Sequence, residues 1–450
     1  MSRTTTGGGS ESGCGRYSRQ RLGQRRSLLP PSPLLLLLLA PLCGAGAAAG
    51  RRAFFGPELA AAPSPCGARS QVQVLRADAA WLTPDALFDA ARGRLHVVYG
   101  TAAKDALYTF SDGGAFAAPT RLNTAGLGVT TTMGERGPKI TMGANGRLIV
   151  VWADLWTGAG CRTYARSSFS ADGGATWSAP ASVAPGVAGV DGLSVAAGTF
   201  GVAQVVATFH VNISMTPPPN ATSATYLHYA LSLDGAATWQ APQVMRIDGG
   251  RTPAIACSMC MTRPRFDADT GELLVAYRAA INDVRDHRVV RAAGAAANNF
   301  STAVVNPRDG WTIPYCPMNG PELSLFVPPG AADATQLVAF MTGDANNVFF
   351  SSRAAAAGGA FGGHVATPAR EPNERYPTAV GSPEGDVLFV WNVGPMAVEG
   401  NATVKWACYA PGSASAAQSG ELGRSFAGTK ATALDLGDHG GLLLITTAQE

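Results

Sequence analysis

Short runs of apolar, β-branched residues recur along the chain, and each begins after a turn glycine and ends in an aromatic residue. The strongest copies are Gly93–Tyr99, Gly146–Trp152, Gly271–Tyr277 and Gly385–Trp391, with weaker copies at Gln204–Thr208 and Gln336–Phe340. A short continuous apolar run is typical of a strand that is buried on both faces. No segment has the 3.6-residue period of a long amphipathic helix. The pattern therefore predicts an all-β fold.

A second short strand precedes most of these runs. From Gly93 to Gly385 the repeat averages about 58 residues, a size typical of propeller blades and longer than most solenoid repeats. We expect a β-propeller of four-stranded antiparallel blades, with six blades favoured and seven as the alternative. The units are expected to start near Asp85, Gly137, Val190, Arg263, Gly320 and Tyr376. The last segment, Lys430–Thr447, is expected to close the ring with a strand at Gln71–Leu75.

Composition excludes several classes of protein. Charged residues make up 14% of the 450 residues and the net charge is +3, so no basic surface for nucleic acid is expected. A hydrophobic content of 46% is too high for a disordered chain. The 54 glycines and 30 prolines fit a fold with many tight turns. Motifs for nucleotide, serine-hydrolase or zinc-protease sites are missing from the sequence, so we expect no cofactor and no metal.

The first fifty residues read as a targeting segment. Six arginines face one acidic residue before Pro33, and an apolar stretch of 16 residues, Leu34–Ala49, follows. A basic start, a short apolar core and small residues are typical of a secretory signal. We therefore divide the chain into a targeting segment (1–50), a linker (51–70) and a propeller (71–450). A retained membrane anchor and an organelle transit peptide are the alternatives, and only the anchor would bring a membrane contact.

Glycosylation signals agree with the secretory route. Four N-x-[ST] sequons occur, at Asn212, Asn220, Asn299 and Asn401. We expect a secreted protein or one of the secretory lumen.

Cysteine spacing also suits an oxidising compartment. Outside the targeting segment the chain holds six cysteines, an even number that fits disulfides. Cys257 and Cys260 have the CxxC spacing of a metal site, but no second CxxC or histidine pair accompanies them. A zinc site stays the minor alternative, and we favour a disulfide from one of this pair to Cys316.

A second motif lies at a fixed phase of the repeat. Ser170–Trp177 and Ser232–Trp239 read S-x-D-G-x-x-T-W, and Phe110–Phe116 is a degenerate copy. The aspartates are Asp112, Asp172 and Asp234. An Asp-Gly pair favours a tight turn whose carboxylate accepts backbone N–H bonds. We therefore expect these aspartates to be structural, with Trp177 and Trp239 packed beneath their own turns.

This motif resembles the Asp box of the sialidase (neuraminidase) superfamily, which is built on a six-bladed β-propeller. Cys257–Asp286 and Gly310–Ser324 further resemble a sialidase-like branch of secreted, mostly bacterial Asp-box proteins. The likeness runs from about Asp85 to Leu444. It implies a glycosidase that acts on acidic glycans.

The resemblance also implies a set of site residues. Sialidases hold the substrate carboxylate with three arginines, and they use a tyrosine nucleophile, a glutamate that assists it and an aspartate acid/base. In this chain Arg136, Arg263 and Arg375 each precede the innermost strand of a blade, where a guanidinium fork could bind a carboxylate. Tyr376 is the candidate nucleophile, assisted by Glu374 or Glu322, and Asp154 is the candidate acid/base. The structural alternatives are solvated or paired arginines, a core tyrosine and a turn aspartate.

One departure from the family weakens the enzymatic interpretation. Sialidases carry a triad arginine in the first blade, but the matching stretch, Thr83–Asp89, has none. Two functions therefore compete: a sialidase-like hydrolase of acidic glycans, and a non-catalytic propeller that binds glycan or protein through its central mouth.

Overall fold

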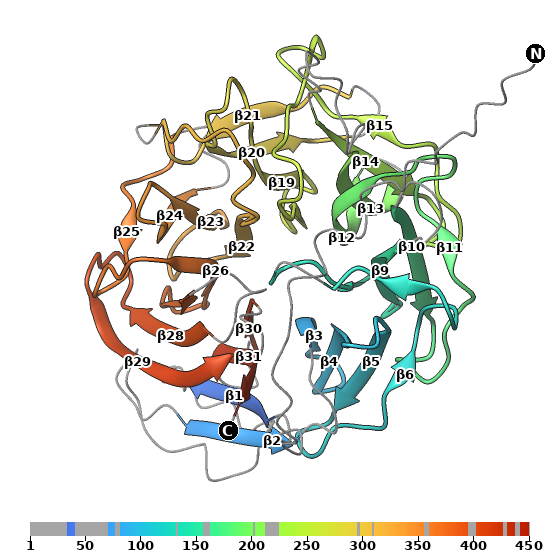
Figure 1. Ribbon diagram of the computed structural model, residues 1–450, viewed down its shortest axis with the longest axis horizontal. Helices are drawn as coiled ribbons and strands as arrows, with labels where there is room; N and C mark the ends of the chain where they lie inside the picture. The colour runs from blue at the N-terminus through green and yellow to red at the C-terminus, as the bar shows by residue number, and fades with distance from the viewer. Residues whose placement is uncertain are drawn as a thin grey trace, which may run out of the picture.

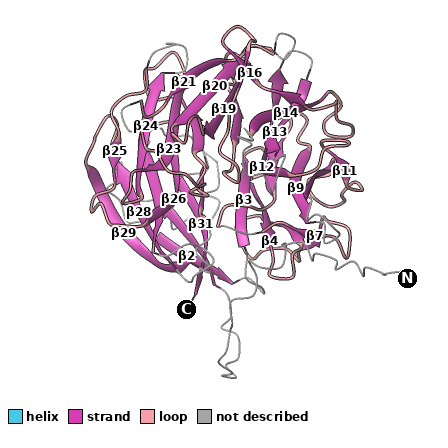
Figure 2. Cartoon of the chain, turned by 45° about the horizontal axis from the view of Figure 1, so that its top comes forward, coloured by secondary structure: helices cyan, strands magenta, loops and turns pink. Residues whose placement is uncertain are grey.

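The computed structural model describes thirteen segments of the chain. They are residues 34–40, 71–76, 82–131, 134–155, 163–200, 203–211, 225–294, 298–307, 310–354, 360–394, 402–425, 430–436 and 442–449. These residues form strands, turns and loops, and no helix occurs among them (Figure 2). The described residues therefore contain no helix that could span a membrane. The all-β prediction is confirmed.

The strands form six four-stranded antiparallel blades around a central axis, as Figure 1 shows. Blade 1 holds β3 (Leu82–Asp89), β4 (Arg94–Gly100), β5 (Ala106–Ser111) and β6 (Thr120–Arg121). Blade 2 holds β8 (Lys139–Met142), β9 (Leu148–Leu155), β10 (Thr163–Ser170) and β11 (Ala181–Ser182), and β7 (Gly128–Val129) pairs with the end of β9. Blade 3 holds β12 (Val190–Phe200), β13 (Ala203–Val211), β14 (Tyr226–Ser232) and β15 (Gln243–Val244).

The second half of the ring repeats this plan. Blade 4 holds β18 (Arg263–Phe266), β19 (Leu273–Arg278), β20 (His287–Ala292) and β21 (Ser301–Val304). Blade 5 holds β22 (Glu322–Phe326), β23 (Thr335–Thr342), β24 (Asn347–Ala354) and β25 (Val365–Ala366). Blade 6 holds β26 (Glu374–Gly381), β27 (Val387–Val393), β28 (Ala402–Tyr409) and β29 (Ala416–Ser425). A two-stranded sheet, β16 (Arg246–Ile247) with β17 (Thr252–Pro253), lies between blades 3 and 4 in sequence. The six predicted units therefore match the six blades.

The hydrophobic core lies between the faces of neighbouring blades. The second strands β4, β9, β19 and β27 are buried along nearly their whole length, as their continuous apolar pattern predicts. One core cluster joins Tyr108 of blade 1 to Trp152 of blade 2, and another joins Phe350 of blade 5 to Trp391 of blade 6. Each blade thus buries both faces against its neighbours, which holds the ring together.

The C-terminal strands close the ring. Thr432 at the start of β30 (Thr432–Asp435) donates its hydroxyl hydrogen bond to the carbonyl of Pro84 in blade 1, at 2.7 Å. On the other side, the Thr378 hydroxyl of blade 6 donates to the carbonyl of Ala431, at 2.9 Å. Because β30 contacts both β3 and β26, it joins the first blade to the last.

The outer part of this closure differs from the expectation. The sequence predicts a strand at Gln71–Leu75 beside the last segment, and β2 (Gln71–Arg76) does share a sheet with β31 (Leu442–Gln449). The two do not pair directly, because β1 (Leu34–Ala40) lies between them. The role of residues 1–50 as a targeting segment stays a prediction.

The Asp-Gly turns are structural, as predicted. The Asp172 carboxylate accepts bonds from the Thr176 amide (2.9 Å), the Thr176 hydroxyl and the Ser170 hydroxyl, and these bonds lower the pKa of Asp172 to about 2. Asp234 repeats the pattern with Thr238 and Ser232. In the degenerate copy, which lacks the threonine, Asp112 forms an ion pair with Arg94 instead.

The tryptophans of these turns also contact the preceding blade, which the sequence analysis did not predict. Trp239 donates its indole N–H to Ser167 of the preceding blade at 2.8 Å, and Trp177 packs edge-on against Tyr108 of blade 1 with ring centroids 4.8 Å apart. Each tryptophan therefore reaches the neighbouring blade, and Trp239 also packs against a core cluster that contains Ala236 of its own turn. Arg147 strengthens the same junction, because its guanidinium donates to the carbonyl of Asp234 at 2.7 Å.

Candidate functional site at the propeller mouth

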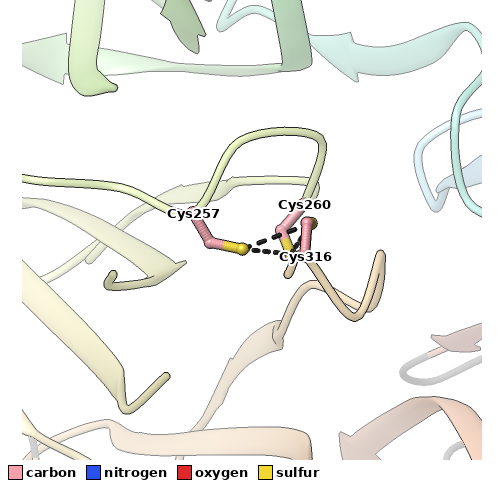
Figure 3. A group of neighbouring side chains, drawn as sticks. All are labelled: Cys257, Cys260 and Cys316. Carbon is pink, nitrogen blue, oxygen red and sulfur yellow. Dashed lines mark hydrogen bonds between the residues drawn. The ribbon is translucent and has the colours of Figure 1, made fainter. Parts of the chain in front are cut away.

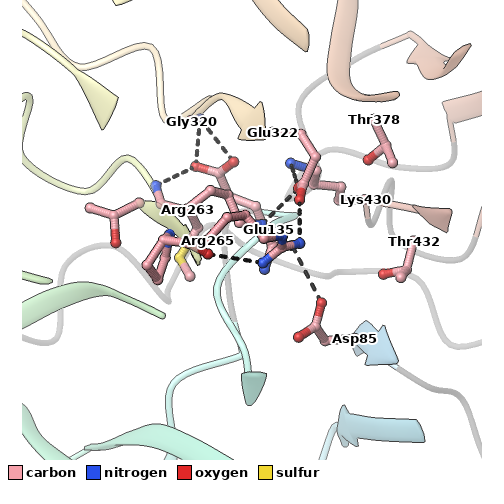
Figure 4. A network of polar contacts seen from close by, with 12 residues as sticks. Asp85, Glu135, Arg263, Arg265, Gly320, Glu322, Thr378, Lys430 and Thr432 are labelled. Atoms are coloured by element: carbon pink, nitrogen blue, oxygen red, sulfur yellow. Dashed lines mark hydrogen bonds and ion pairs between the residues drawn. The ribbon is translucent and has the colours of Figure 1, made fainter. Parts of the chain in front are cut away.

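A proline followed by a polar residue marks the start of five innermost strands. Proline suits the first residues of a strand because it has no N–H to donate to the ladder. The prolines are Pro84, Pro138, Pro264, Pro321 and Pro377, and the residues after them are Asp85, Lys139, Arg265, Glu322 and Thr378. This pattern brings charged side chains from several blades together at one mouth of the ring (Figure 4).

Glu322 is the centre of this charged cluster. Its carboxylate accepts a bond from Arg263 Nε at 2.7 Å, and it forms ion pairs with Lys430 Nζ at 2.9 Å and with Arg265 at 3.5 Å. Burial alone would raise the pKa of Glu322, but Arg263, Lys430 and Arg265 together hold it below its ordinary value. Glu322 is therefore an ionised carboxylate with no capacity left for a further cation.

Arg263 joins three blades through its two carboxylate partners. Its Nη2 lies 3.3 Å from Asp85 of blade 1, while its Nε bonds Glu322 of blade 5. Asp85 also accepts the Ile140 amide of blade 2 at 3.0 Å. Arg263 is buried, whereas Arg265 is 38% exposed and so presents the accessible guanidinium of the cluster.

Lys139 is a buried amine without an ionic partner. Its side chain is 3% exposed, and within the described part of the chain it forms no ion pair or hydrogen bond. Burial lowers the pKa of Lys139 to about 8, with Arg263 and Lys430 adding to the effect and Asp85 opposing it. An amine with such a pKa exchanges protons near neutral pH, a property found at catalytic sites.

Glu135 is held by the backbone of two neighbouring blades. Its carboxyl accepts the Met261 amide at 3.1 Å and the Gly320 amide at 2.9 Å. Burial raises the pKa of Glu135 in spite of nearby Lys430 and these two bonds. A carboxylate with a raised pKa is a stronger proton acceptor than an ordinary one.

Tyr376 lies against the segment that carries Glu135. A Cβ placed on Gly134 would come within 2.7 Å of the Tyr376 hydroxyl, so the phenol covers the glycine immediately before Glu135. Tyr376 is buried and has a φ of +51°, which is strained for an aromatic residue. Such strain is concentrated at functional sites, where the surrounding structure maintains it. A chain of contacts links this segment to the charged cluster, because the Lys430 amide donates to the Gly134 carbonyl at 2.6 Å.

The structure places the other predicted catalytic residues elsewhere. Glu374 accepts bonds from the Thr367 hydroxyl (2.6 Å) and the Val348 amide (3.0 Å), which fixes it at the junction of blades 5 and 6. Asp154 accepts the Trp152 indole and forms an ion pair with Arg166, both at 2.8 Å. Both carboxylates therefore have full sets of structural partners.

The three predicted arginines lie on alternate blades, 2, 4 and 6. Only Arg263 contacts the charged cluster. Arg136 forms an ion pair with Asp191 of blade 3, and Arg375 has a buried Nε without a hydrogen-bond partner. Arg265 lies two residues after Arg263 on β18 and is the more accessible of these two arginines.

The cysteines and sequons add two observations. Cys257, Cys260 and Cys316 are free thiols whose sulfur atoms lie 3.2 to 3.5 Å apart (Figure 3), so the predicted disulfide stays a prediction. Asn299 is exposed, which suits a glycosylation site, whereas Asn212, Asn220 and Asn401 lie outside the described residues.

A surface groove of about 510 Å³ lies away from the mouth. Asp248, Glu272, Arg291 and Asn299 line it at the outer part of blade 4. It holds none of the predicted catalytic residues. The convergence of titratable groups favours the mouth as the functional site.

Solved structures resemble the chain at low sequence identity. No family model and no curated protein matches the chain. Among solved structures, an α-L-arabinofuranosidase from Fusarium graminearum is 13% identical with a TM-score of 0.48, covering 73% of this chain and 93% of that one. An ulvan lyase is 15% identical with a TM-score of 0.46, covering 84% and 94%. Trypanosoma rangeli sialidase is 10% identical with a TM-score of 0.43, covering 72% and 54%. At these identities the likeness concerns the fold alone.

Charged groups of both signs converge at the mouth. Four cationic side chains, Arg263, Arg265, Lys139 and Lys430, face three carboxyl groups, Asp85, Glu135 and Glu322. With all of them ionised, one positive charge is left over in a largely dry site. The repeated proline–polar pairs indicate part of this cluster in the sequence. Lys430 belongs to no such pair.

Proposed function

We propose that the mouth of the propeller binds an acidic glycan and hydrolyses its terminal glycosidic bond in a sialidase-like reaction. The observation that carries this proposal is the strained Tyr376 packed against Gly134, beside a cluster with an excess of positive charge. A nucleophile and an anion site occur together at one mouth, which is the combination that cleavage of an acidic sugar needs.

The residues take separate roles in this scheme. Arg265 and Lys139 bind the sugar carboxylate, because Arg265 is partly exposed and the buried Lys139 forms no hydrogen bond or ion pair with the described residues. Tyr376 attacks the anomeric carbon as the glycosidic C–O bond breaks, Glu135 accepts the phenolic proton, and the departing alcohol takes a proton from solvent. Water then attacks the anomeric carbon, the sugar leaves with the water oxygen, and Tyr376 recovers its proton. Glu135 replaces Glu374 and Glu322 as the expected assistant, since the first is bound to the junction of blades 5 and 6 and the second is neutralised by three cations. Secretion, expected from the N-terminal sequence, would bring this site to extracellular glycans.

The test is hydrolysis of a fluorogenic sialoside by the full chain between pH 4 and 9, with a fluorogenic galactoside as the neutral comparison. We expect turnover of the sialoside only. Tyr376→Phe should lower kcat by at least about 100-fold, because loss of a nucleophile removes the covalent route. Arg265→Ala should raise KM about 10-fold by removing a charged contact. Arg121→Ala, an exposed ion-pair residue at the edge of blade 1, is the matched control.

The non-catalytic alternative rests on Asp85. This carboxylate occupies the first-blade position where sialidases carry an arginine, and it neutralises Arg263. If the chain binds a sialylated glycan but turns over no sialoside at any pH, and Arg265→Ala abolishes the binding, the protein is a glycan-binding propeller. Turnover that persists unchanged in Tyr376→Phe would refute the assignment of the nucleophile.

A further inference from the structure

Three cysteine thiols from two loops converge beside the mouth. Cys257 and Cys260 lie in the loop that leads to β18, and Cys316 lies in the loop that leads to β22 (Figure 3). The distances between sulfur atoms are 3.2 Å (257–316), 3.4 Å (257–260) and 3.5 Å (260–316). Cys257 and Cys260 are buried, and Cys316 is partly exposed.

A buried arginine beside these thiols lacks a carboxylate. Arg278 is 1% exposed and donates only to backbone carbonyls, those of Asn319 (3.0 Å), Arg285 (3.1 Å) and Met341 (2.7 Å). No acidic side chain in the described part of the chain pairs with it. Its backbone carbonyl accepts the Cys257 amide at 2.8 Å, and its charge acts on the sulfurs of Cys257 and Cys260. Since a buried cation without a counter-charge is costly, Arg278 points to a negative charge at the thiol cluster.

A second polar group near the cluster is also unsatisfied. Asn319, three residues after Cys316, is fully buried, and neither its Oδ1 nor its Nδ2 has a hydrogen-bond partner. A buried amide in a folded protein normally bonds protein, water or an ion-bound group. The missing counter-charge of Arg278 and the unsatisfied side chain of Asn319 both point to a ligand that the described residues do not supply.

We propose that Cys257, Cys260 and Cys316 bind a zinc ion as three thiolates. Binding of Zn²⁺ to three thiols releases three protons and leaves a site of net charge −1, which the single positive charge of Arg278 balances. A copper(I) ion in the same site would leave a charge of −2, so the electrostatics favour zinc. Thiolate sulfur is a preferred ligand of both metals.

The geometry requires little movement. Zinc–sulfur bonds of about 2.3 Å in a tetrahedral site place the sulfurs about 3.8 Å apart, so the thiols would separate by a few tenths of an ångström. The three cysteines are the whole set of nearby His, Cys, Asp and Glu ligands among the described residues. Since Cys316 is partly exposed, the fourth coordination position faces solvent and takes water or an added ligand.

Zinc at this site would stabilise the two loops that position the charged cluster at the mouth. The two loops that it joins lead directly to Arg263 and Glu322, and Glu135 already bridges the same loops through the amides of Met261 and Gly320. The zinc proposal stands on its own geometry and does not depend on hydrolysis of a glycan.

The experiment measures metal in the full chain. The chain is purified under reducing conditions, loaded with one equivalent of Zn²⁺ and passed through gel filtration, and its metal content is measured by mass spectrometry. We expect one zinc ion per chain. Replacement by Co²⁺ should give an intense near-ultraviolet thiolate-to-cobalt charge-transfer band. Cys316→Ser should weaken zinc binding by at least about 100-fold, since even second-shell changes cost up to that much. Tyr315→Ser, at the adjacent residue with 64% exposure, should bind zinc normally.

Two results would overturn the proposal. One is a native chain in which Cys316 forms a stable disulfide with Cys257 or Cys260. The other is a reduced chain that keeps no zinc and shows no cobalt charge-transfer band. If Cys316→Ser fails to fold, the cobalt spectrum of the unsubstituted chain decides the question alone.

Discussion

Burial of the single residue Lys139 at the mouth lowers the stability of the folded protein. Burial disfavours its ammonium group, the cations Arg263 and Lys430 add to this effect, and the carboxylates Asp85 and Glu322 oppose it. The unfolded chain therefore binds the Lys139 proton more tightly than the folded protein does. A residue that destabilises the fold in this way is expected where function requires it.

Replacement of Lys139 by an apolar residue should remove this destabilisation of the folded protein. The pKa falls from 10.5 to about 8 on folding, so the destabilisation is complete below pH 8 and disappears as the pH rises toward 10.5. We expect Lys139→Met to raise the free energy of unfolding by up to about 3 kcal/mol at pH 7, and by much less at pH 9.5. Urea unfolding at both pH values measures this difference. Lys104→Met, at an exposed lysine, is the control, and an equal gain at both pH values would contradict the argument.

At the scale of the structural element, the Asp-Gly turns connect blades as well as strands. The turn after β14 orients Trp239, whose indole bonds Ser167 in β10, and Arg147 of blade 2 bonds the backbone of the same turn. Each turn therefore combines a local set of hydrogen bonds with a contact across the blade junction.

The link between Trp239 and Ser167 can be measured directly. Trp239→Phe keeps one aromatic ring but removes the indole N–H and part of the packed ring surface, and it leaves the buried Ser167 hydroxyl without this partner. We expect the lost hydrogen bond to contribute about 1 kcal/mol to the decrease in the free energy of unfolding, a typical value for one hydrogen bond. In a double-mutant cycle, Ser167→Ala should remove most of that loss. Additive effects of the two substitutions would show that the bond contributes no coupling energy.

For the whole molecule, ring closure depends on a short strand from the far end of the sequence. β30 contacts β3 and β26, and the Thr432 hydroxyl bonds a residue 348 positions earlier in the chain. Lys430 lies two residues before this strand and forms an ion pair with Glu322. The closing segment therefore also contacts the charged cluster. Stability of the ring and order at the mouth are therefore connected.

Weakening this closure should first increase local opening of the two blades that it joins. Thr432→Val removes the bond to Pro84 and should cost about 1 kcal/mol. Hydrogen exchange of amides in β3 and β26 should increase by about 5-fold, while exchange in blades 3 and 4 stays unchanged. Thr302→Val, on the exposed outer strand β21, is the control. A uniform increase over all blades would contradict a local role for Thr432.

Much of the architecture is predictable because its signals are local. Apolar runs after a glycine identified the buried strands, and the spacing of the repeats gave six blades and nearly correct starting points. The Asp-Gly turns were assigned correctly because an aspartate bonds backbone groups only a few residues away. The contacts of the tryptophans across the blade junction were not predicted, because these partners lie one blade away, 72 residues distant for Trp239.

The mouth was only partly predictable. The start of each innermost strand was the place that the sequence analysis considered, and there the structure does bring Arg263 and Glu322 together. Lys139, Lys430 and Glu135 were not assigned a role, because their effect depends on which loops meet across the ring. Arg263 and Asp85, for example, are 178 residues apart in sequence.

The sequence by itself determined the strands, the turns and the number of blades, since these follow from patterns within a few dozen residues. Only the tertiary structure decided which charges pair, which arginine is accessible, and that three cysteines from two loops converge. The physical reason is that burial and electrostatic interaction depend on distance in space. A closed ring brings together residues whose separation along the chain carries no information about that distance.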